Sequence, residues 1–224
     1  MSAQYPKETL PEPTGSPAAR PPMHQPSAQR QLKRYLDVVL ASAALLAAAP
    51  LLVAIAAALK LEGTTPVIFR QQRTGLDGRL FTIYKFRTMS PEAPGQPHQQ
   101  RATRVGQWLR RFALDELPQL WNVLRGEMSI IGPRPALPEQ AKRYGKFERR
   151  RLQVKPGITG WAQINGRNSL SWSRRIELDV WYIENGSLWT DLSILIRTPL
   201  QLAKPQDVYG ANGTNVDFTP RPHE

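Results

Sequence analysis

The sequence predicts a mostly helical α+β fold, in which an apolar membrane helix and interfacial amphipathic helices accompany a small β-hairpin. Three patterns lead to this fold class. Residues 38–59 carry no charge. Residues 67–86 have a near-alternating apolar pattern around a glycine turn, and residues 101–124 and 171–203 repeat apolar side chains at helical spacing. The length suits one domain with a tail.

The composition limits the function classes. The 224 residues carry a formal net charge of +12, with an isoelectric point near 10.5, so we expect an anionic partner: nucleic acid, a membrane face or a phosphorylated substrate. The absence of cysteine excludes a disulfide scaffold, a cysteine-ligated metal centre and a cysteine nucleophile. The three histidines lie in Pro/Gln-rich or terminal stretches, which argues against a histidine metal site. No Walker motif occurs, which argues against hydrolysis of nucleoside triphosphates.

The first segment, residues 1–31, is expected to be a disordered Pro-rich tail. It holds seven of the 21 prolines and almost no branched aliphatic side chains, so it cannot bury a core. Its order of residues is not that of a signal peptide. The predicted organisation is therefore a tail over 1–31, a membrane helix over 32–62 and a domain over 63–218.

The charge-free run of 22 residues over 38–59 would form a helix ~33 Å long, enough to cross a bilayer. A spanning helix is thus one interpretation, and a buried soluble helix is another. Pro50 favours a kink or break near the middle. Basic residues flank both ends, Lys33 and Arg34 before and Lys60 after, and the positive-inside rule then marks both ends as cytoplasmic. These features favour a re-entrant helix that bends at Pro50 and leaves by the face it entered.

A β-hairpin is expected next. Val67–Phe69 and Leu80–Phe86 have the apolar composition of short strands, and Gly75 to Gly78 supply the turn between them. The second strand places Lys85 and Arg87 at its end. Residues 90–100 are expected to form a flexible loop.

Two helices are expected to meet at Asp115-Glu116. The first has its apolar stripe over 101–113, and the second begins with Leu117, where Pro118 is tolerated in the first turn if Asp115 is the N-cap. The remaining segments are assigned by composition: irregular over 129–138, turn-rich over 156–168, and amphipathic helices over 171–185 and 188–203.

The Asp115-Glu116 pair is the sharpest candidate for catalysis. A carboxylate at a helix start faces unpaired N–H groups and the positive end of the helix dipole, which keeps it ionised. An ionised carboxylate held there can attack phosphorus and become an acyl phosphate. The plain alternative is structural, since Asp is a common N-cap and Glu is common in a first turn.

Cations beside turns, prolines or the carboxylate pair are the second feature. Arginine and lysine neutralise the non-bridging oxygens of a transferring phosphoryl group. The alternative is a basic surface facing anionic lipid. That alternative suits Arg149–Arg151 better than Arg134, whose backbone is fixed between two prolines. The candidate phosphate-binding residues are Lys85, Arg87, Arg110, Arg111, Arg134 and Arg167.

Several motifs, in one order, resemble those of a known family. They are K-R-x-x-D (33–37), an apolar segment interrupted at Pro50, K-F-R-T-M (85–89), L-D-E-L-P-Q-L-x-N-V-L-x-G-x-M-S (114–129), G-P-R-P (132–135) and K-P-G-I-T-G-W-A-Q-I-N-G-R-N (155–168). The chain is similar in these motifs to the bacterial sugar transferases, the monotopic polyprenyl-phosphate phosphoglycosyl transferases, in their short catalytic-core form. The resemblance covers roughly residues 30–218.

The resemblance implies transfer of a sugar-1-phosphate from a UDP-sugar to undecaprenyl phosphate, with release of UMP. This would be the first membrane step of exopolysaccharide, capsule, O-antigen or glycan assembly. It implies Asp115 as the nucleophile of a two-step course, Glu116 as its support, and Mg²⁺ held by both. It further implies Lys85, Arg87, Arg110, Arg134 and Arg167 as phosphate-binding residues, and a re-entrant helix that breaks here at Ala49-Pro50 instead of the family's Ser-Pro.

The implied location is the cytoplasmic face of a bacterial inner membrane, with inner-membrane lipids as surroundings. A second function class stays open: a membrane-anchored basic scaffold or nucleic-acid adaptor. The acidic pair among cations argues against it, and no named nucleic-acid module is found, so we expect no nucleic-acid partner. The sequence leaves open which sugar is transferred and whether the protein is a homodimer.

Overall fold

The computed structural model describes residues 27–90, 102–166 and 169–203. The predicted tail and the loop over 90–100 therefore lie almost wholly outside the described residues. Residues 27–31, however, are helical, so the predicted tail boundary at residue 31 is wrong. The reason is local, because Pro26 is the last proline before this stretch and helix-compatible residues follow it.

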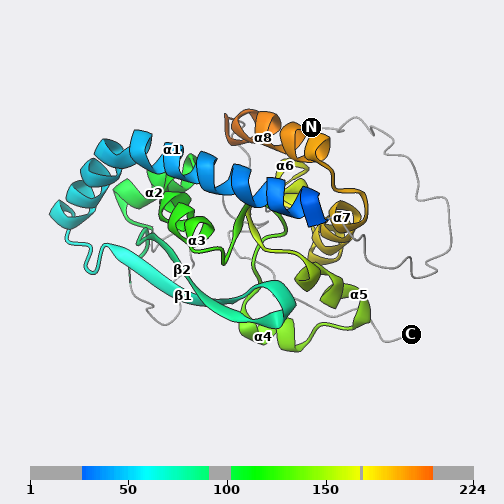
Figure 1. The fold of residues 1–224 in the computed structure, drawn as a ribbon. Helices are drawn as coiled ribbons and strands as arrows, with labels where there is room; N and C mark the ends of the chain where they lie inside the picture. The colour runs from blue at the N-terminus through cyan, green and yellow to red at the C-terminus, as the bar shows by residue number, and fades with distance from the viewer. Residues whose placement is uncertain (1–26, 91–101, 167–168, 204–224) are drawn as a thin grey trace, which may run out of the picture.

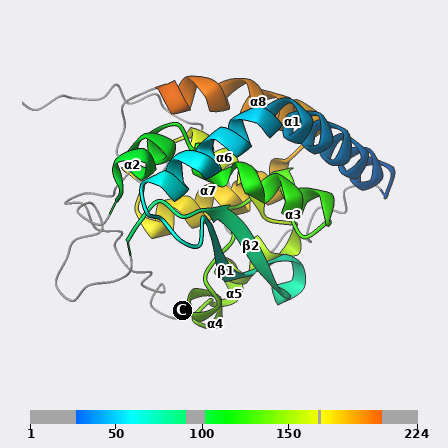
Figure 2. The same ribbon diagram turned by 90° about the vertical axis from the view of Figure 1, so that its left-hand side faces the viewer.

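Helix α1 (Ser27–Leu61) crosses one face of the molecule (Figure 1). It is long and apolar enough to cross a membrane, and 11% of its most apolar stretch is buried against the rest of the chain. Pro50 lies inside the helix and does not end it, so the chain forms no break there. Both ribbon views show α1 bent, with its second part turned away from the line of the first (Figures 1 and 2). Loss of one backbone donor is compatible with a bend in a helix that otherwise continues.

Residues of the K-R-x-x-D motif bind the start of α1 to the rest of the domain. Lys33 Nζ lies 2.5 Å from Asp191 Oδ2, and the Asp37 carboxylate is buried. Because buried charges need partners, these contacts fix where α1 sits above the core. The further bonds run from Arg34 to the carbonyls of Val123 and Leu124, and from Ser129 Oγ and the Ile130 N–H to Asp37 Oδ1.

The predicted hairpin is confirmed. Strands β1 (Ile68–Thr74) and β2 (Leu80–Phe86) pair antiparallel, and a short turn, η1 (Leu76–Gly78), joins them. Phe69 lies opposite Lys85 in the register. Gly78 takes a positive φ of 78°, which glycine adopts without the Cβ penalty of other residues.

The helical region around Asp115 differs from the prediction in one respect. Helix α2 (Arg104–Arg111) is followed by a 3-10 turn, η2 (Leu114–Gln119), and by α3 (Leu120–Leu124). Ala113, with φ 54° and ψ 23°, is the cap of η2, and its carbonyl accepts from the Glu116 N–H at 3.2 Å. The turn thus starts earlier than predicted, and Asp115 is inside the first turn instead of capping it.

A parallel strand pair crosses segments that the sequence predicts to be irregular. Strand β3 (Ser129–Ile131) pairs with β4 (Gly157–Thr159), so the prediction for 129–138 is wrong over its first three residues. Glycine permits this pairing, because a Cβ on Gly157 would lie 2.1 Å from the Gly132 nitrogen. The short helices of this region are α4 (Pro138–Lys142), α5 (Lys146–Arg149), η3 (Arg150–Gln153) and α6 (Trp161–Ile164).

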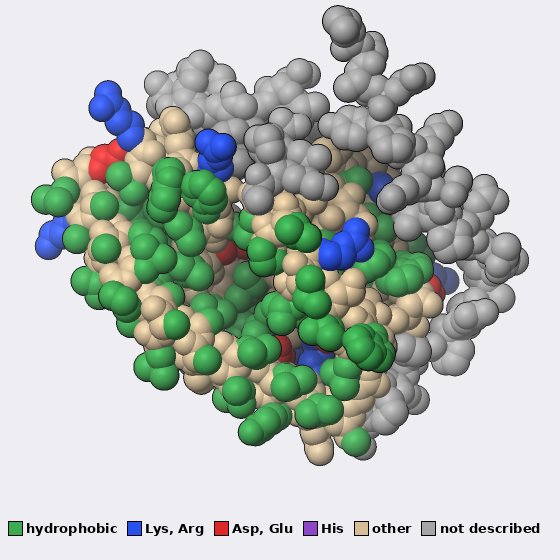
Figure 3. Space-filling view, turned by 90° about the horizontal axis from the view of Figure 1, so that it is seen from above, with side chains coloured by type: hydrophobic (Ala, Val, Ile, Leu, Met, Phe, Trp, Pro, Cys, Tyr) green, Lys and Arg blue, Asp and Glu red, His purple; other side chains and the backbone are tan. Residues whose placement is uncertain are grey.

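Two amphipathic helices close the described chain, as predicted. They are α7 (Trp172–Asn185) and α8 (Leu188–Ala203). Helix α7 packs inward, with Ile176 2% exposed, whereas α8 lies beside α1 (Figure 1) and leaves Trp189 80% exposed. Seen from above, the side chains of this face are mainly hydrophobic (Figure 3). A face rich in apolar side chains is typical of a surface that contacts a membrane or another apolar partner.

Candidate active site

Asp115 is a buried carboxylate at the start of η2. Its residue is 8% exposed, and its carboxylate forms no hydrogen bond or ion pair with the residues that the structure describes. Burial, with the neighbouring charge of Glu116, raises the pKa of Asp115 from 3.8 to about 6, although Lys85, Arg110 and Arg134 oppose the rise. A carboxylate in this setting is a stronger base than ordinary aspartate and is ionised near neutral pH.

Glu116 has a different environment, although it is adjacent in the sequence. Arg134 holds it with two hydrogen bonds, Nη2 to Oε1 at 2.6 Å and Nη1 to Oε2 at 3.2 Å. The Glu116 charge and its hydrogen bonds raise the pKa of Arg134 above its ordinary value. The two carboxylates are therefore differentiated: one is engaged by a forked cation, and the other is not.

Three of the predicted cations surround the pair. Lys85 comes from β2, Arg110 from α2 and Arg134 from the loop after β3. Burial lowers the pKa of Lys85, while Asp115 and Glu116 raise it. Arg110 is further oriented by Met89, whose Sδ lies 2.7 Å from its Nη1. The structure thus brings together Asp115, Glu116 and these three cations from segments far apart in the sequence.

The other predicted cations have different settings. Arg87 Nε donates to the carbonyl of Pro66 at 2.8 Å, and its guanidinium lies over the Phe69 ring. Arg111 lies over the ring of Phe112. Arg167 falls outside the described residues, so its predicted role stays a prediction.

Arg73 is a cation that the sequence analysis missed. Burial, and repulsion from Arg134, lower its pKa to about 10, while Glu116 opposes this. Its Nη1 donates to the Pro135 carbonyl at 3.2 Å and its Nη2 to Gln71 Oε1 at 2.7 Å. The alternation of β1 could have found it, because Phe69, Gln71 and Arg73 share one face of the hairpin with Lys85.

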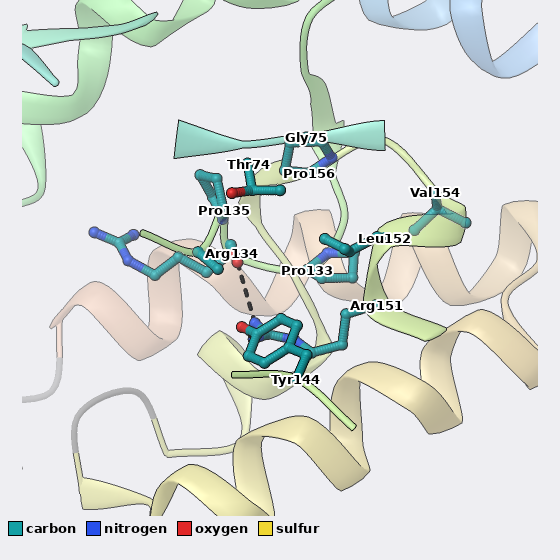
Figure 4. A pocket seen from close by; sticks show the side chains of 11 residues that line it. Thr74, Gly75, Pro133, Arg134, Pro135, Tyr144, Arg151, Leu152, Val154 and Pro156 are labelled. Atoms are coloured by element: carbon teal, nitrogen blue, oxygen red, sulfur yellow. Dashed lines mark hydrogen bonds between the residues drawn. The ribbon is translucent and has the colours of Figure 1, made fainter. Parts of the chain in front are cut away.

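Arg149–Arg151 were expected to be lipid-facing, and the structure contradicts this for Arg151. Its side chain is 4% exposed and forms an ion pair with Asp179, which is 2% exposed. Arg150 is paired with Glu184. The sequence could not show this, because both partners lie on α7, far along the chain. Figure 4 shows Arg151 below the loop that carries Arg134, beside a small pocket.

The chain is similar to known proteins over most of its length. The family model described as bacterial sugar transferase matches residues 28–205. The chain belongs to the bacterial sugar transferase family. Its relatives include the uncharacterized sugar transferase EpsL of Bacillus subtilis (strain 168), 43% identical over 83% of this chain and 94% of that protein.

Two further members of the bacterial sugar transferase family carry an activity in their names. UDP-glucose:undecaprenyl-phosphate glucose-1-phosphate transferase of Escherichia coli (strain K12) is 46% identical over 75% of this chain and 39% of its own length. The protein of the same name from Caulobacter vibrioides (strain ATCC 19089 / CIP 103742 / CB 15) is 44% identical over 79% of this chain and 72% of its own length. The chain thus spans less than half of some relatives and most of others.

Asp115 and Glu116 are the carboxylates of this site that could hold Mg²⁺. Among the described residues no cluster of three or more Asp, Glu or His side chains could hold a metal ion. Mg²⁺ is commonly held by one or two carboxylates together with substrate phosphates and water, so Asp115 fits as one ligand. Glu116 has both oxygens bound to Arg134 and would have to share one of them.

Proposed function

We propose that this protein transfers a sugar-1-phosphate from a UDP-sugar to undecaprenyl phosphate and releases UMP. The observation that carries the proposal is the buried Asp115 carboxylate, whose pKa is raised to about 6, facing Lys85, Arg110 and Arg134. Cations in excess over carboxylates favour a polyanion such as a diphosphate. The names of the Escherichia coli and Caulobacter relatives support the same reaction class and make UDP-glucose the first donor to test.

In the first step an Asp115 oxygen attacks the phosphorus that bears the sugar. The bond from that phosphorus to the bridging oxygen breaks, and the bridging oxygen leaves with UMP. The product is an acyl phosphate in which the phosphorus is bonded to an Asp115 oxygen and still carries the sugar. Lys85 and Arg110 neutralise charge on the non-bridging oxygens, and Arg134 keeps Glu116 from adding its full negative charge to the approaching phosphate.

In the second step a phosphate oxygen of undecaprenyl phosphate attacks the same phosphorus. The acyl bond breaks, Asp115 regains its carboxylate, and the sugar remains on a lipid diphosphate. One site therefore serves two phosphate substrates in turn. Bound Mg²⁺, held by Asp115 with Glu116 beside it, would supply further neutralisation of the phosphate oxygens.

The place of reaction follows from the substrates. The lipid phosphate lies at headgroup level, whereas a UDP-sugar is soluble, so the carboxylate has to sit at the interface. We infer that α1 is re-entrant, with both ends on the cytoplasmic face of the inner membrane, and that α8 lies in the interface. The bend of α1 and the apolar face formed with α8 support this placement (Figures 1 and 3). The first membrane step of a polysaccharide pathway is the corresponding cellular role.

The test is a single-turnover experiment in detergent. With a UDP-sugar, Mg²⁺ and no lipid phosphate, the protein should release at most one equivalent of UMP and gain the mass of one phospho-sugar. Asp115→Asn should abolish both signals, because a neutral amide does not form the acyl phosphate. UMP that appears only after addition of lipid phosphate would indicate direct transfer. Absence of UMP with every UDP-sugar and lipid phosphate would favour the scaffold or nucleic-acid adaptor class.

A further inference from the structure

The loop that carries Arg134 is fixed at four consecutive backbone carbonyls. Its two prolines have no N–H, so the loop cannot build regular hydrogen bonds of its own. Donors from separate segments supply them instead. The four bonds are Gly157 N–H to Pro133 at 2.9 Å, Arg151 Nη2 to Arg134 at 3.1 Å, Arg73 Nη1 to Pro135 at 3.2 Å and Thr74 N–H to Ala136 at 2.9 Å.

Arg151 is a buried side-chain donor among these. Its Nη2 also lies 2.7 Å from Asp179 Oδ2, and its Nη1 donates to Tyr144 Oη at 2.6 Å. Figure 4 shows Arg151 and Tyr144 beneath the loop, with the Arg134 side chain directed away from them. The Arg134 backbone is thus held on the inner side, while its guanidinium reaches Glu116 on the outer side.

A buried ion pair is weak evidence for stability alone. Removing two charges from water costs free energy that their attraction repays incompletely, so apolar residues of similar volume often stabilise a core as well. Arg151 and Asp179 are nevertheless almost fully buried, 4% and 2% exposed. The geometry gives the pair a task that apolar residues could not perform, because an aliphatic side chain has no donor for the Arg134 carbonyl.

We propose that Arg151, oriented by Asp179, is a positioning residue that acts on the active site through Arg134. It fixes the backbone of Arg134, whose guanidinium forms the ion pair with Glu116. Through this pair it determines how strongly the Glu116 charge acts on Asp115. The proposal rests on the proposed function of the Asp115 site. Lysine cannot replace this arginine, because one ammonium group cannot match the planar fork toward Asp179, Tyr144 and the carbonyl together.

Arg151→Lys is the test variant, and Tyr144→Phe is its matched control. The lysine keeps a cation beside Asp179 and should leave the protein folded in detergent, but kcat/KM for the UDP-sugar should fall on the order of tenfold to a hundredfold through misplacement of Arg134. Tyr144→Phe removes one bond of the same guanidinium and leaves the bond to the Arg134 carbonyl. Its kcat/KM should therefore stay near the wild-type value.

A double-mutant cycle separates positioning from a general structural effect. If Arg151 acts through Arg134, then Arg151→Lys should cause no further loss of kcat/KM in an Arg134→Ala background. Losses that multiply in the double variant would overturn the proposal. If Arg151→Lys fails to fold, Asp179→Asn takes its place in the same cycle, because it loosens the orientation of Arg151 and retains an acceptor.

Hydrogen exchange supplies a measurement that does not depend on activity. In the wild-type protein the Thr74 and Gly157 N–H groups, which donate to this loop, should be protected, and Arg151→Lys should raise their exchange while Tyr144→Phe should not. Unchanged protection in Arg151→Lys would also overturn the proposal. If the wild type releases no UMP, the proposed function fails, yet the exchange comparison still decides whether Arg151 fixes the loop.

Discussion

Asp115→Asn should make the protein more stable at neutral pH while it abolishes the transfer. Asp115 is 8% exposed, and its pKa is raised from 3.8 to about 6. The difference of about two pKa units means that ionised Asp115 lowers the free energy of unfolding by about 3 kcal/mol above pH 6. Asparagine has nearly the same shape and carries no charge, so the variant avoids this cost.

The raised pKa of Asp115 determines how its contribution to stability changes with pH. A raised carboxyl pKa means that the folded protein retains a proton over the window from 3.8 to about 6, where the unfolded chain has lost it. The contribution of Asp115 to wild-type stability should therefore fall as the pH rises through this window and stay level above it. The advantage of the variant should be largest above pH 6, shrink to about half near pH 5, and vanish below pH 3.8.

The assay is thermal unfolding in detergent, followed by circular dichroism. For a chain of this length, about 3 kcal/mol corresponds to a Tm increase of roughly 6–12 °C at pH 7.5. Asp77→Asn is the matched control, because Asp77 is exposed and its φ of 54° is one that asparagine tolerates. A Tm for Asp115→Asn equal to or below that of the wild type at pH 7.5 would refute the reasoning from burial.

Three further predictions concern the cations and the membrane helix. Arg134→Ala should lower kcat/KM roughly 10- to 150-fold, because charge-assisted contacts are lost. Its control is Arg125→Ala, which removes an arginine of similar exposure from its pair with Glu127 and should have little effect. Equal losses in steady-state UMP release would contradict this prediction. The acid limb of the pH–kcat/KM profile is expected near pH 6, and Lys85→Gln should move it to higher pH, because Lys85 opposes the rise in the Asp115 pKa. A limb that stays in place or moves to lower pH would count against the Lys85–Asp115 interaction. Pro50→Ala should shift α1 toward a spanning topology. The measurement is the labelling of single cysteines, placed before and after the helix, with an impermeant reagent. Identical labelling of both ends in wild type and variant would show that Pro50 does not determine the topology.

Local patterns were sufficient to predict the elements that are built locally. The hairpin over 68–86 and the helices α7 and α8 follow from side-chain period and turn residues, and these need no distant partner. The pairing of β3 with β4 escaped prediction because each strand has three residues and its ladder depends on a segment far along the chain. Sequence alone located the carboxylate pair, but it could not distinguish the two carboxylates.

The burial of cations was the least predictable part of the site. A run of three arginines over 149–151 looks like a solvated surface until Asp179 and Glu184 approach from α7. Arg73 was overlooked for a related reason: a cation in a strand is a common surface residue. Its face of the hairpin became informative once the structure placed Lys85 near Asp115 and Glu116. Burial of a charge is a property of its distant partners, so composition gives no sign of it.

The adjacent carboxylates have different environments because their partners differ. Two buried like charges at neighbouring positions raise each other's pKa, and a site with both groups unpaired would bind a proton near neutral pH. Arg134 engages both oxygens of Glu116, so the repulsion on Asp115 is partly offset without an ion pair to Asp115 itself. In the proposed reaction Asp115 is therefore the carboxylate that attacks, and Lys85 and Arg110 are the cations that would meet the phosphate. Because the loop that carries Arg134 is held at four carbonyls, the different settings of the two carboxylates are fixed by the backbone before any substrate binds.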